Sequence, residues 1–344
     1  MTYSKLGNIK GPQGRRGLNM TGGATPPPAV DESTLEGDLW LDSTTGDVYR
    51  ASAPDPWKKD GTWHTWGTVL WKVADDVLMV QPAEGDTGTT GEPANFGYFQ
   101  GAPWCKSSNN PSVESMTSVR SKGAIAMNAN SEGLFEYCSA FTDLSPISGW
   151  NVLNVTNMSA LFAGCTYLTD LSPLSGWNVS GVTDMSSLFA NCKALTDLSP
   201  LSGWGISGET TVNSMFADCT SLTNLSALSN WNVSGVTYLT DMFYGCTSLT
   251  DASALSNWDV SSVTSMQEAF SGCPLERIGV PSLDHGGKNF VSNLKSASAV
   301  TDMDTTMLTN TTTHETMSAN QIIADMDANP SKYSTGTVWT IARA

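Results

Sequence analysis

Three types of side chain recur every 27 residues through the middle of the chain, and this period constrains the fold more than any other feature of the sequence. The recurring residues are Trp150, Trp177, Trp204, Trp231 and Trp258, then Phe135, Phe162, Phe189, Phe216, Phe243 and Phe270, and finally Cys138, Cys165, Cys192, Cys219, Cys246 and Cys273. A fixed period of this size is typical of an array in which each unit covers its hydrophobic face with the next one. We therefore expect these side chains to form the core ladder of a repeat region over residues 123–277.

Counted with tryptophan as position 1, the second repeat predicts a strand at its start. Trp177 and Val179 alternate with Asn178 and Ser180, so the apolar pair is expected to point inward and the polar pair outward. Leu174, just before them, belongs to the same predicted strand. Equivalent strands of successive repeats would then pair into a short parallel β-sheet.

The next part of the repeat predicts a short helix and an extended return. Met185, Leu188 and Cys192 have the spacing of one helix face. Thr183 is the expected N-cap and Asp184 lies in the first turn, where the helix dipole favours an anion. The return, in extended or 3₁₀ turns, carries Leu195, Leu198 and Leu201. The predicted fold class is therefore an α/β solenoid, a stack of about five to six such coils.

Composition excludes some classes of function. The net charge is −16 and the sequence pI is about 4.4, so the surface would repel a nucleic-acid backbone. No apolar run approaches the roughly 20 residues that span a bilayer, and residues 1–10 lack the apolar region of a signal peptide. We therefore expect no nucleic-acid partner, no membrane insertion and no export by the usual route.

The first 35 residues are expected to be an extended attachment segment. Between Gly11 and Gly17 glycine stands at every third position, which is the collagen rule, although a plain linker fits as well. Pro26–Pro28 predicts a stiff spacer.

Residues 36–80 predict a small β domain. Gly37–Asp42 alternates apolar and polar residues, 43–47 supplies a turn, and Val48–Arg50 returns as a strand, which together indicate a hairpin. A cluster of tryptophans favours core packing over an aromatic sugar platform, and it comprises Trp57, Trp63, Trp66 and Trp71. Residues 81–122 are expected to form a linker and an N-terminal cap, and 278–344 a C-terminal cap. The latter predicts a helix over 318–326 with Ser318 as N-cap, and a final strand over 337–342.

Two polar rows follow the repeat. The first is expected to line one face of the parallel sheet, either as a solvated surface or as a ligand-binding strip, and consists of Asn151, Asn178, Ser180, Ser207, Asn232, Ser234, Asp259 and Ser261. The second row is acidic and either caps turns, the interpretation we favour, or shares a calcium ion, and it contains Asp143, Asp170, Asp197 and Asp251, with Asn224 between them.

Nothing in the sequence indicates catalysis, a cofactor or a metal site. The seven cysteines include no C-x-x-C pair, and we expect the six in register to be small buried side chains rather than disulfides. Cys105 lies outside the register and receives no assignment. His64, His285 and His314 stand in no nucleophile or metal motif, so a glycan hydrolase remains the least favoured class.

The repeats resemble the BspA-like leucine-rich-repeat family. The resemblance rests on Trp231–Thr237 (WNVSGVT) and on Met242–Cys246 (MFYGC), which match a recurring signature of that family. It implies a leucine-rich-repeat fold and surface adhesion to varied ligands. The third repeat departs from the signature, with Gly205, Ile206 and Val212 in place of asparagine, valine and methionine.

The N-terminal part is similar to tail-fibre proteins of bacteriophages, through Gly37–Asp42 (GDLWLD) followed by Thr45–Tyr49 (TGDVY). This resemblance implies a homotrimeric virion protein that is assembled in the host cytoplasm. Its N-terminal region would bind other virion proteins, and its repeats would contact a host surface glycan or protein. The alternative is a bacterial cell-surface adhesin of the BspA-like type.

Overall fold

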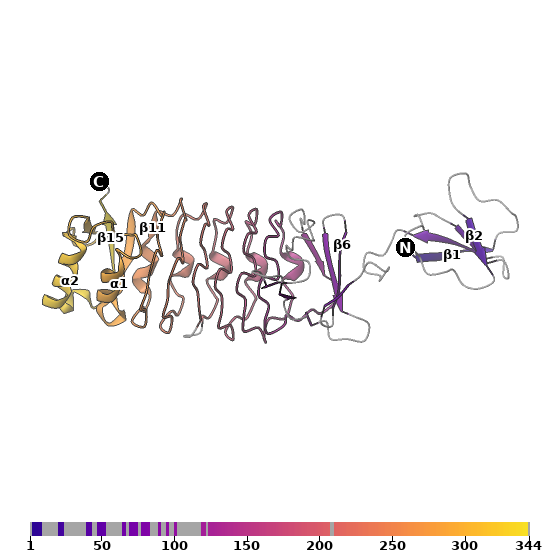
Figure 1. Cartoon of the computed structure of the whole chain (residues 1–344), viewed down its shortest axis with the longest axis horizontal. Helices are drawn as coiled ribbons and strands as arrows, with labels where there is room; N and C mark the ends of the chain where they lie inside the picture. The colour runs from indigo at the N-terminus through magenta and orange to yellow at the C-terminus, as the bar shows by residue number, and fades with distance from the viewer. Residues whose placement is uncertain are drawn as a thin grey trace.

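The structure is a computed structural model that describes residues 2–8, 20–23, 39–42, 47–52, 64–66, 69–74, 77–82, 89–90, 94–95, 100–101, 118–121, 123–206 and 210–342. Residues 123–206 and 210–342 form an elongated body in which successive repeats lie side by side along one axis (Figure 1). Helix content is low, and the strands gather before and after the repeats. Within the described residues, no helix combines the length and the apolar character that crossing a bilayer requires.

The first sheet has the order β1-β4-β3-β2. Its strands are β1 (Thr2–Asn8), β2 (Met20–Gly23), β3 (Leu39–Asp42) and β4 (Asp47–Ser52). Strands β3 and β4 are antiparallel with Trp40 opposite Tyr49, which confirms the predicted hairpin. Strands β1 and β2 fall in the segment expected to be extended, so the predicted boundary at residue 36 does not coincide with the limits of this sheet.

The second sheet has the order β10-β7-β6-β5. It contains β5 (His64–Trp66), β6 (Val69–Ala74), β7 (Val77–Pro82) and β10 (Ser118–Ser121), and a separate pair is formed by β8 (Ala94–Asn95) and β9 (Gln100–Gly101). Several sequence predictions lie outside the described residues, namely those for Gly11–Gly17, Pro26–Pro28, Trp57, Trp63 and Cys105.

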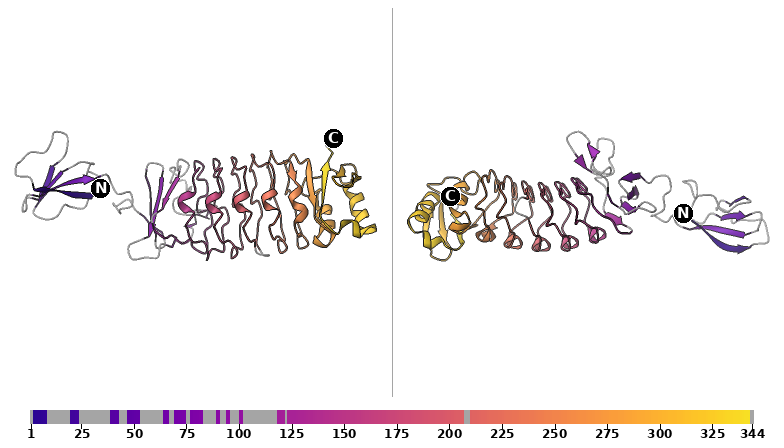
Figure 2. Two further views of the ribbon diagram at one scale, coloured as in Figure 1. Left: turned by 180° about the vertical axis from the view of Figure 1, so that it is seen from behind. Right: turned by 90° about the horizontal axis from the view of Figure 1, so that it is seen from below.

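Each repeat contains one short 3₁₀ helix, and these helices recur along one side of the repeat region (Figure 2). They are η2 (Ser145–Ile147), η3 (Ser172–Leu174), η4 (Ser199–Leu201), η5 (Ser226–Leu228) and η6 (Ser253–Asn257). Proline follows the first serine in η2, η3 and η4, where its fixed φ suits the start of a helical turn. The 3₁₀ turn predicted for the return segment at Leu201 is thus confirmed.

Aromatic side chains fill the interior. The phenylalanine rings of successive repeats stack with centroids 5.6–5.8 Å apart, and the tryptophan of the next repeat tilts against each of the first four rings. All five tryptophans are buried, and so are the leucines of the return segment. One repeat alone would leave this stripe exposed to water, so the hydrophobic effect favours the stacked arrangement.

The predicted helix over Met185–Cys192 is wrong. The N–H groups of Leu188, Ala190 and Cys192 bond to carbonyls three residues earlier, as in tight turns. The alternate N–H groups of Ser187 and Phe189 instead donate to Asn213 and Met215 of the next repeat.

An α-helix needs every N–H for its own i→i−4 bonds, so this alternation excludes it. Residues 123–206 and 210–277 contain no α-helix. Thr183 is likewise no N-cap, because both its N–H and its hydroxyl donate to the carbonyl of Thr156 in the preceding repeat.

The predicted strand at Trp177–Ser180 is also wrong. Parallel bridges between repeats run through Asn157, Asp184 and Thr211, seven residues after each tryptophan. At Asn178 the side chain accepts the N–H of Ser180. This local bond makes a turn, and it competes with the pairing that a ladder would need.

The C-terminal segment closes a five-stranded sheet of order β11-β12-β15-β13-β14. Its elements are β11 (Asp251–Ala252), β12 (Arg277–Val280), η7 (Leu283–His285), α1 (Gly287–Asn293), β13 (Met307–Asn310), β14 (Thr316–Ser318), α2 (Ala319–Ala328), η8 (Pro330–Tyr333) and β15 (Thr337–Ile341).

Helix α2 and strand β15 confirm the prediction for this segment, and Ser318 forms a capping box with Gln321. The segment also covers the last repeat, since Glu268 and Phe270 donate their N–H groups to Ser296 and Ala297.

Candidate functional site

The first polar row consists of side-chain-capped turns on the outside of the repeats. In three repeats the Oδ1 atom at position 2 accepts both the N–H and the hydroxyl of the serine two residues later. These pairs are Asn178–Ser180, Asn232–Ser234 and Asp259–Ser261. The predicted flat β face is therefore replaced by a row of rigid turns, while the prediction that the row binds a ligand stays a prediction.

The turns fix which atoms face solvent. In Asn178 and Asn232 the Oδ1 atom is occupied by two donors, and within the described residues the Nδ2 group makes no hydrogen bond. These two exposed amides present donors to solvent from the second and fourth repeats, with Gly205 at the equivalent position between them.

In the other repeats the first polar row lacks this asparagine–serine pair. Asn151 caps Leu153, an exposed apolar residue, in place of serine. Gly205 cannot cap, Asp259 presents an acceptor, and Ser207 lies outside the described residues.

The acidic row caps the 3₁₀ helices. Asp143, Asp170, Asp197 and Asp251 each accept the N–H of the serine two residues later, at 2.8 Å, and Asn224 does the same at 3.1 Å. This confirms the turn-capping interpretation.

At Asp170 the capping bonds also stabilise the charged form of the carboxyl. Hydrogen bonds from the N–H and then the hydroxyl of Ser172 lower the pKa of Asp170. In the part of the chain that the structure describes, no group of three or more His, Cys, Asp or Glu residues could hold a metal ion.

The cysteines of the ladder are free thiols that lie inside the repeats. Each Sγ from Cys165 to Cys273 donates to the carbonyl of the phenylalanine 30 residues earlier, at 3.0–3.3 Å. Burial raises the pKa of Cys192 well above its usual value and that of Cys219 to about 12. Such thiols serve packing, because the reactive thiolate form is disfavoured.

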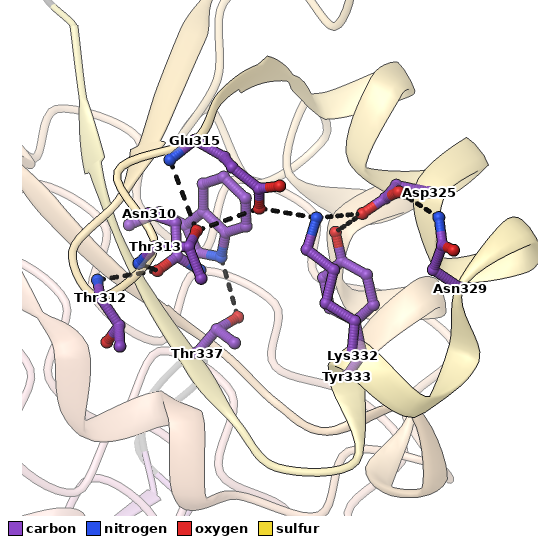
Figure 3. A network of polar contacts seen from close by, with 10 residues as sticks. Asn310, Thr312, Thr313, Glu315, Asp325, Asn329, Lys332, Tyr333 and Thr337 are labelled. Atoms are coloured by element: carbon purple, nitrogen blue, oxygen red, sulfur yellow. Dashed lines mark hydrogen bonds and ion pairs between the residues drawn. The ribbon is translucent and has the colours of Figure 1, made fainter.

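A polar network in the C-terminal segment is a candidate that sequence reasoning missed (Figure 3). The ammonium of Lys332 lies 2.6 Å from both Glu315 and Asp325, and the hydroxyl of Tyr333 donates to Asp325 at 2.6 Å. Asn329 donates to the other oxygen of Asp325 at 2.7 Å. The residues of the network are spread over 310–337, so no short sequence motif predicts it.

This network borders a cavity of about 260 Å³ lined by residues 310–313, 332–333 and 335–338. The hydrogen bond from Lys332, followed by that from Tyr333, lowers the pKa of Asp325 to about 2. Burial and the bond to Asp325 raise the pKa of Tyr333. The single ammonium of Lys332 thus serves both carboxylates, which suits a rigid support for the surrounding loops better than a reactive centre.

A buried carboxyl lies at the other end of the repeats. Glu136 is only 9% exposed, and burial, with the charge of Glu132 as a second cause, raises its pKa to about 7. Burial and the charge of Asp184 raise the pKa of Glu132 as well. Glu136 is therefore poised to change charge near neutral pH.

The repeat region can be compared with known families once its geometry is established. The sequence model of one family, described as "Mycoplasma protein of unknown function, DUF285", matches the chain twice, over residues 129–227 and 210–316. No curated protein matches the chain, and no solved structure does. The two matches together span more than half of the 344 residues. The chain therefore belongs to this family, which is associated with BspA-like repeat proteins.

Proposed function

We propose that residues 123–277 form a leucine-rich-repeat-like solenoid that binds a host surface glycan or protein, and that the chain is a fibre or receptor-binding protein of a phage virion. The observation that carries this proposal is the outward row of amide donors at Asn178 and Asn232, held by capped turns. Because the turn already fixes each side chain, little rotamer entropy is lost when a ligand binds.

A periodic surface suits a periodic ligand. A glycan presents hydroxyl and ring oxygens at regular intervals, and these accept hydrogen bonds from amide donors. The net charge of −16 favours ligands that are neutral or cationic. These features support binding rather than catalysis as the activity of the chain.

The N-terminal region supports the virion assignment. Its GDLWLD and TGDVY segments, which resemble tail-fibre proteins, contain strand β3 and the first half of strand β4, and these two strands pair antiparallel. In the proposed arrangement this region binds other virion proteins and the repeats face the host. A fibre of this kind is expected to be a homotrimer, so light scattering of the full chain should give three times 36.5 kDa.

The ligand row is tested by replacing Asn178 and Asn232 together with aspartate. Asp259 forms the same turn naturally, so the double variant should fold with an unchanged Tm while losing both donors. The control is Asn224→Asp, which adds charge in the other row, where aspartate is the usual residue. The fluorescently labelled full chain is incubated with intact bacterial cells, and the amount bound is measured. Binding should fall for the double variant alone. Equal binding by all three proteins would contradict the assignment of this row.

The family match favours a second candidate, a bacterial cell-surface adhesin. Location separates the two candidates. Antibodies against the repeats should label purified virions in electron micrographs if the chain is a fibre. Labelled envelopes of uninfected bacteria, with unlabelled virions, would instead support the adhesin.

A further inference from the structure

The junction between the third and fourth repeats differs from its neighbours. Elsewhere the N–H at position 9 donates to the position-8 carbonyl of the next repeat, as Met185 does to Thr211 at 2.8 Å and Leu239 to Ser265 at 3.0 Å. The N–H of Val212, the equivalent residue at this junction, makes no such bond within the described residues. Among the described residues, the bond that the N–H groups of Thr183 and Thr264 make to the preceding repeat has no counterpart at Thr237.

The interruption is local. Three bonds resume directly after it, from Ser214 to Thr240, from Phe216 to Met242 and from Asp218 to Tyr244. Where the bonds are missing, a cavity of about 210 Å³ opens, lined by Thr210, Thr211, Gly235, Thr237 and Tyr238. The two repeats thus part at one place on the surface while the core beneath remains continuous.

Tyr238 replaces a residue that stabilises the turn in other repeats. At position 8, Asn130, Asn157, Asp184 and Ser265 each accept the N–H of position 10 with their side chains. A tyrosine ring cannot make this bond, and the side chain is 51% exposed. The side-chain hydrogen bond that stabilises this turn in other repeats is therefore missing at the same junction where the cavity opens. Such a loss of local stabilisation is expected at functional positions.

The backbone that carries Tyr238 is nevertheless well held from the other side. Thr264 donates both its N–H, at 2.8 Å, and its hydroxyl, at 3.1 Å, to the carbonyl of Thr237. Tyr238 itself bridges to Ser265 in parallel register. The ring is thus presented from a fixed backbone beside a cavity, which lowers the entropy that binding would cost.

We propose that this junction is a carbohydrate-binding site in which a single sugar ring stacks on Tyr238. The cavity is smaller than the roughly 300–1,000 Å³ that hold drug-sized ligands, which suits one pyranose. A sugar offers C–H groups to the aromatic face and hydroxyls to the polar rim. The hydroxyls of Thr211 and Thr237 supply donors and acceptors on that rim. The proposal deepens the proposed function and rests on it, because it names the class of receptor.

Saturation-transfer NMR on the full chain tests the site, with the methyl glycosides of N-acetylglucosamine, galactose and rhamnose as probes. At least one probe should receive magnetisation from the protein. Tyr238→Ser places at this position the residue found in the next repeat, so it should fold, and it should weaken the Kd by about tenfold. The control Tyr167→Ser removes a tyrosine that is 65% exposed on another repeat, and its transfer should match the wild type.

Three results would overturn the proposal: no transfer to any of the three sugars, equal transfer in Tyr238→Ser, or equal loss in both variants. Binding of the same proteins to intact bacterial cells separates this from the proposed function. If no sugar receives transfer but the wild type binds cells, the sugar site is wrong and the attachment function stands. If the wild type binds sugar but no cells, the attachment function is wrong and the site stands.

Discussion

The indole Nε1 of Trp231 donates a hydrogen bond of 2.9 Å to the carbonyl of Leu201, thirty residues earlier in the chain. Trp204 and Trp258 make the equivalent bonds to Leu174 and Leu228. The Nε1 atoms of Trp150 and Trp177 are buried and have no hydrogen-bond partner among the residues that the structure describes. The tryptophan column therefore contains two classes of member that differ in one hydrogen bond, and this difference can be measured.

Replacement of Trp231 by phenylalanine should destabilise the chain more than the same change at Trp177. Both substitutions remove the same buried volume, but only the first also removes an indole hydrogen bond, the one to the carbonyl of Leu201. That carbonyl keeps the N–H of Trp204 as its other donor. The excess loss is expected to be about 0.5–1.5 kcal/mol, the net value of one hydrogen bond, read from urea unfolding of the two variants. Equal losses would mean that the indole hydrogen bond adds nothing to the stability.

Gly245→Ala should destabilise the fold. Gly245 has a φ of +68°, and a Cβ there would overlap the carboxylate of Asp218 in the preceding repeat. Strain and repacking together are expected to cost about 1–3 kcal/mol. Gly176→Ala is the control, because a Cβ at that position meets no atom within 4 Å. Thermal unfolding should lower the Tm of the first variant only, and an unchanged Tm would show that Asp218 moves away freely.

Glu136→Gln should stabilise the protein at pH 8 and have little effect at pH 4. The folded-state pKa of Glu136 is raised to about 7, so folding favours the protonated carboxyl. The wild type accordingly loses stability as the pH rises from about 4.5 through 7. After allowance for solvent screening, the expected gain at pH 8 is about 1–2 kcal/mol. Thermal melts at both pH values measure it, and a gain of the same size at pH 4 would contradict the titration.

The buried cysteines should resist alkylation in the native state. Cys138, Cys165, Cys192, Cys219 and Cys246 are buried, and Cys273 is only half-buried. With iodoacetamide at pH 8, Cys273 should therefore be modified first among these six, and the others only after unfolding, as mass spectrometry of peptides would show. Rapid native labelling of Cys192 would indicate that the repeats open locally.

Much of the interior could be predicted from the period alone. A residue type that recurs every 27 positions faces the same neighbours in each repeat, so Trp177, Phe189 and Cys192 are recognisable as members of a buried column. Gln321 follows Ser318 by three positions, so their capping box depends only on residues close together in the sequence and could be predicted as well. In the sequence, Tyr238 stands out only as an aromatic residue at a position that is polar in the other repeats. Its exposure could not be predicted from that difference alone.

The path of the backbone between these buried positions could not be predicted in the same way. The spacing of Met185, Leu188 and Cys192 fits a helix and also fits a succession of tight turns. Ser187 and Asn191 adopt left-handed φ values of 56° and 61°, and Ser187 sends its N–H to the next repeat.

What the sequence by itself determined is the set of side chains that point inward, because burial depends on chemical type and on spacing along one chain. What only the tertiary structure decided is which partner each backbone N–H takes. That choice depends on the carbonyls of a repeat 27 residues away, and these are brought within hydrogen-bonding distance only after the repeats have stacked.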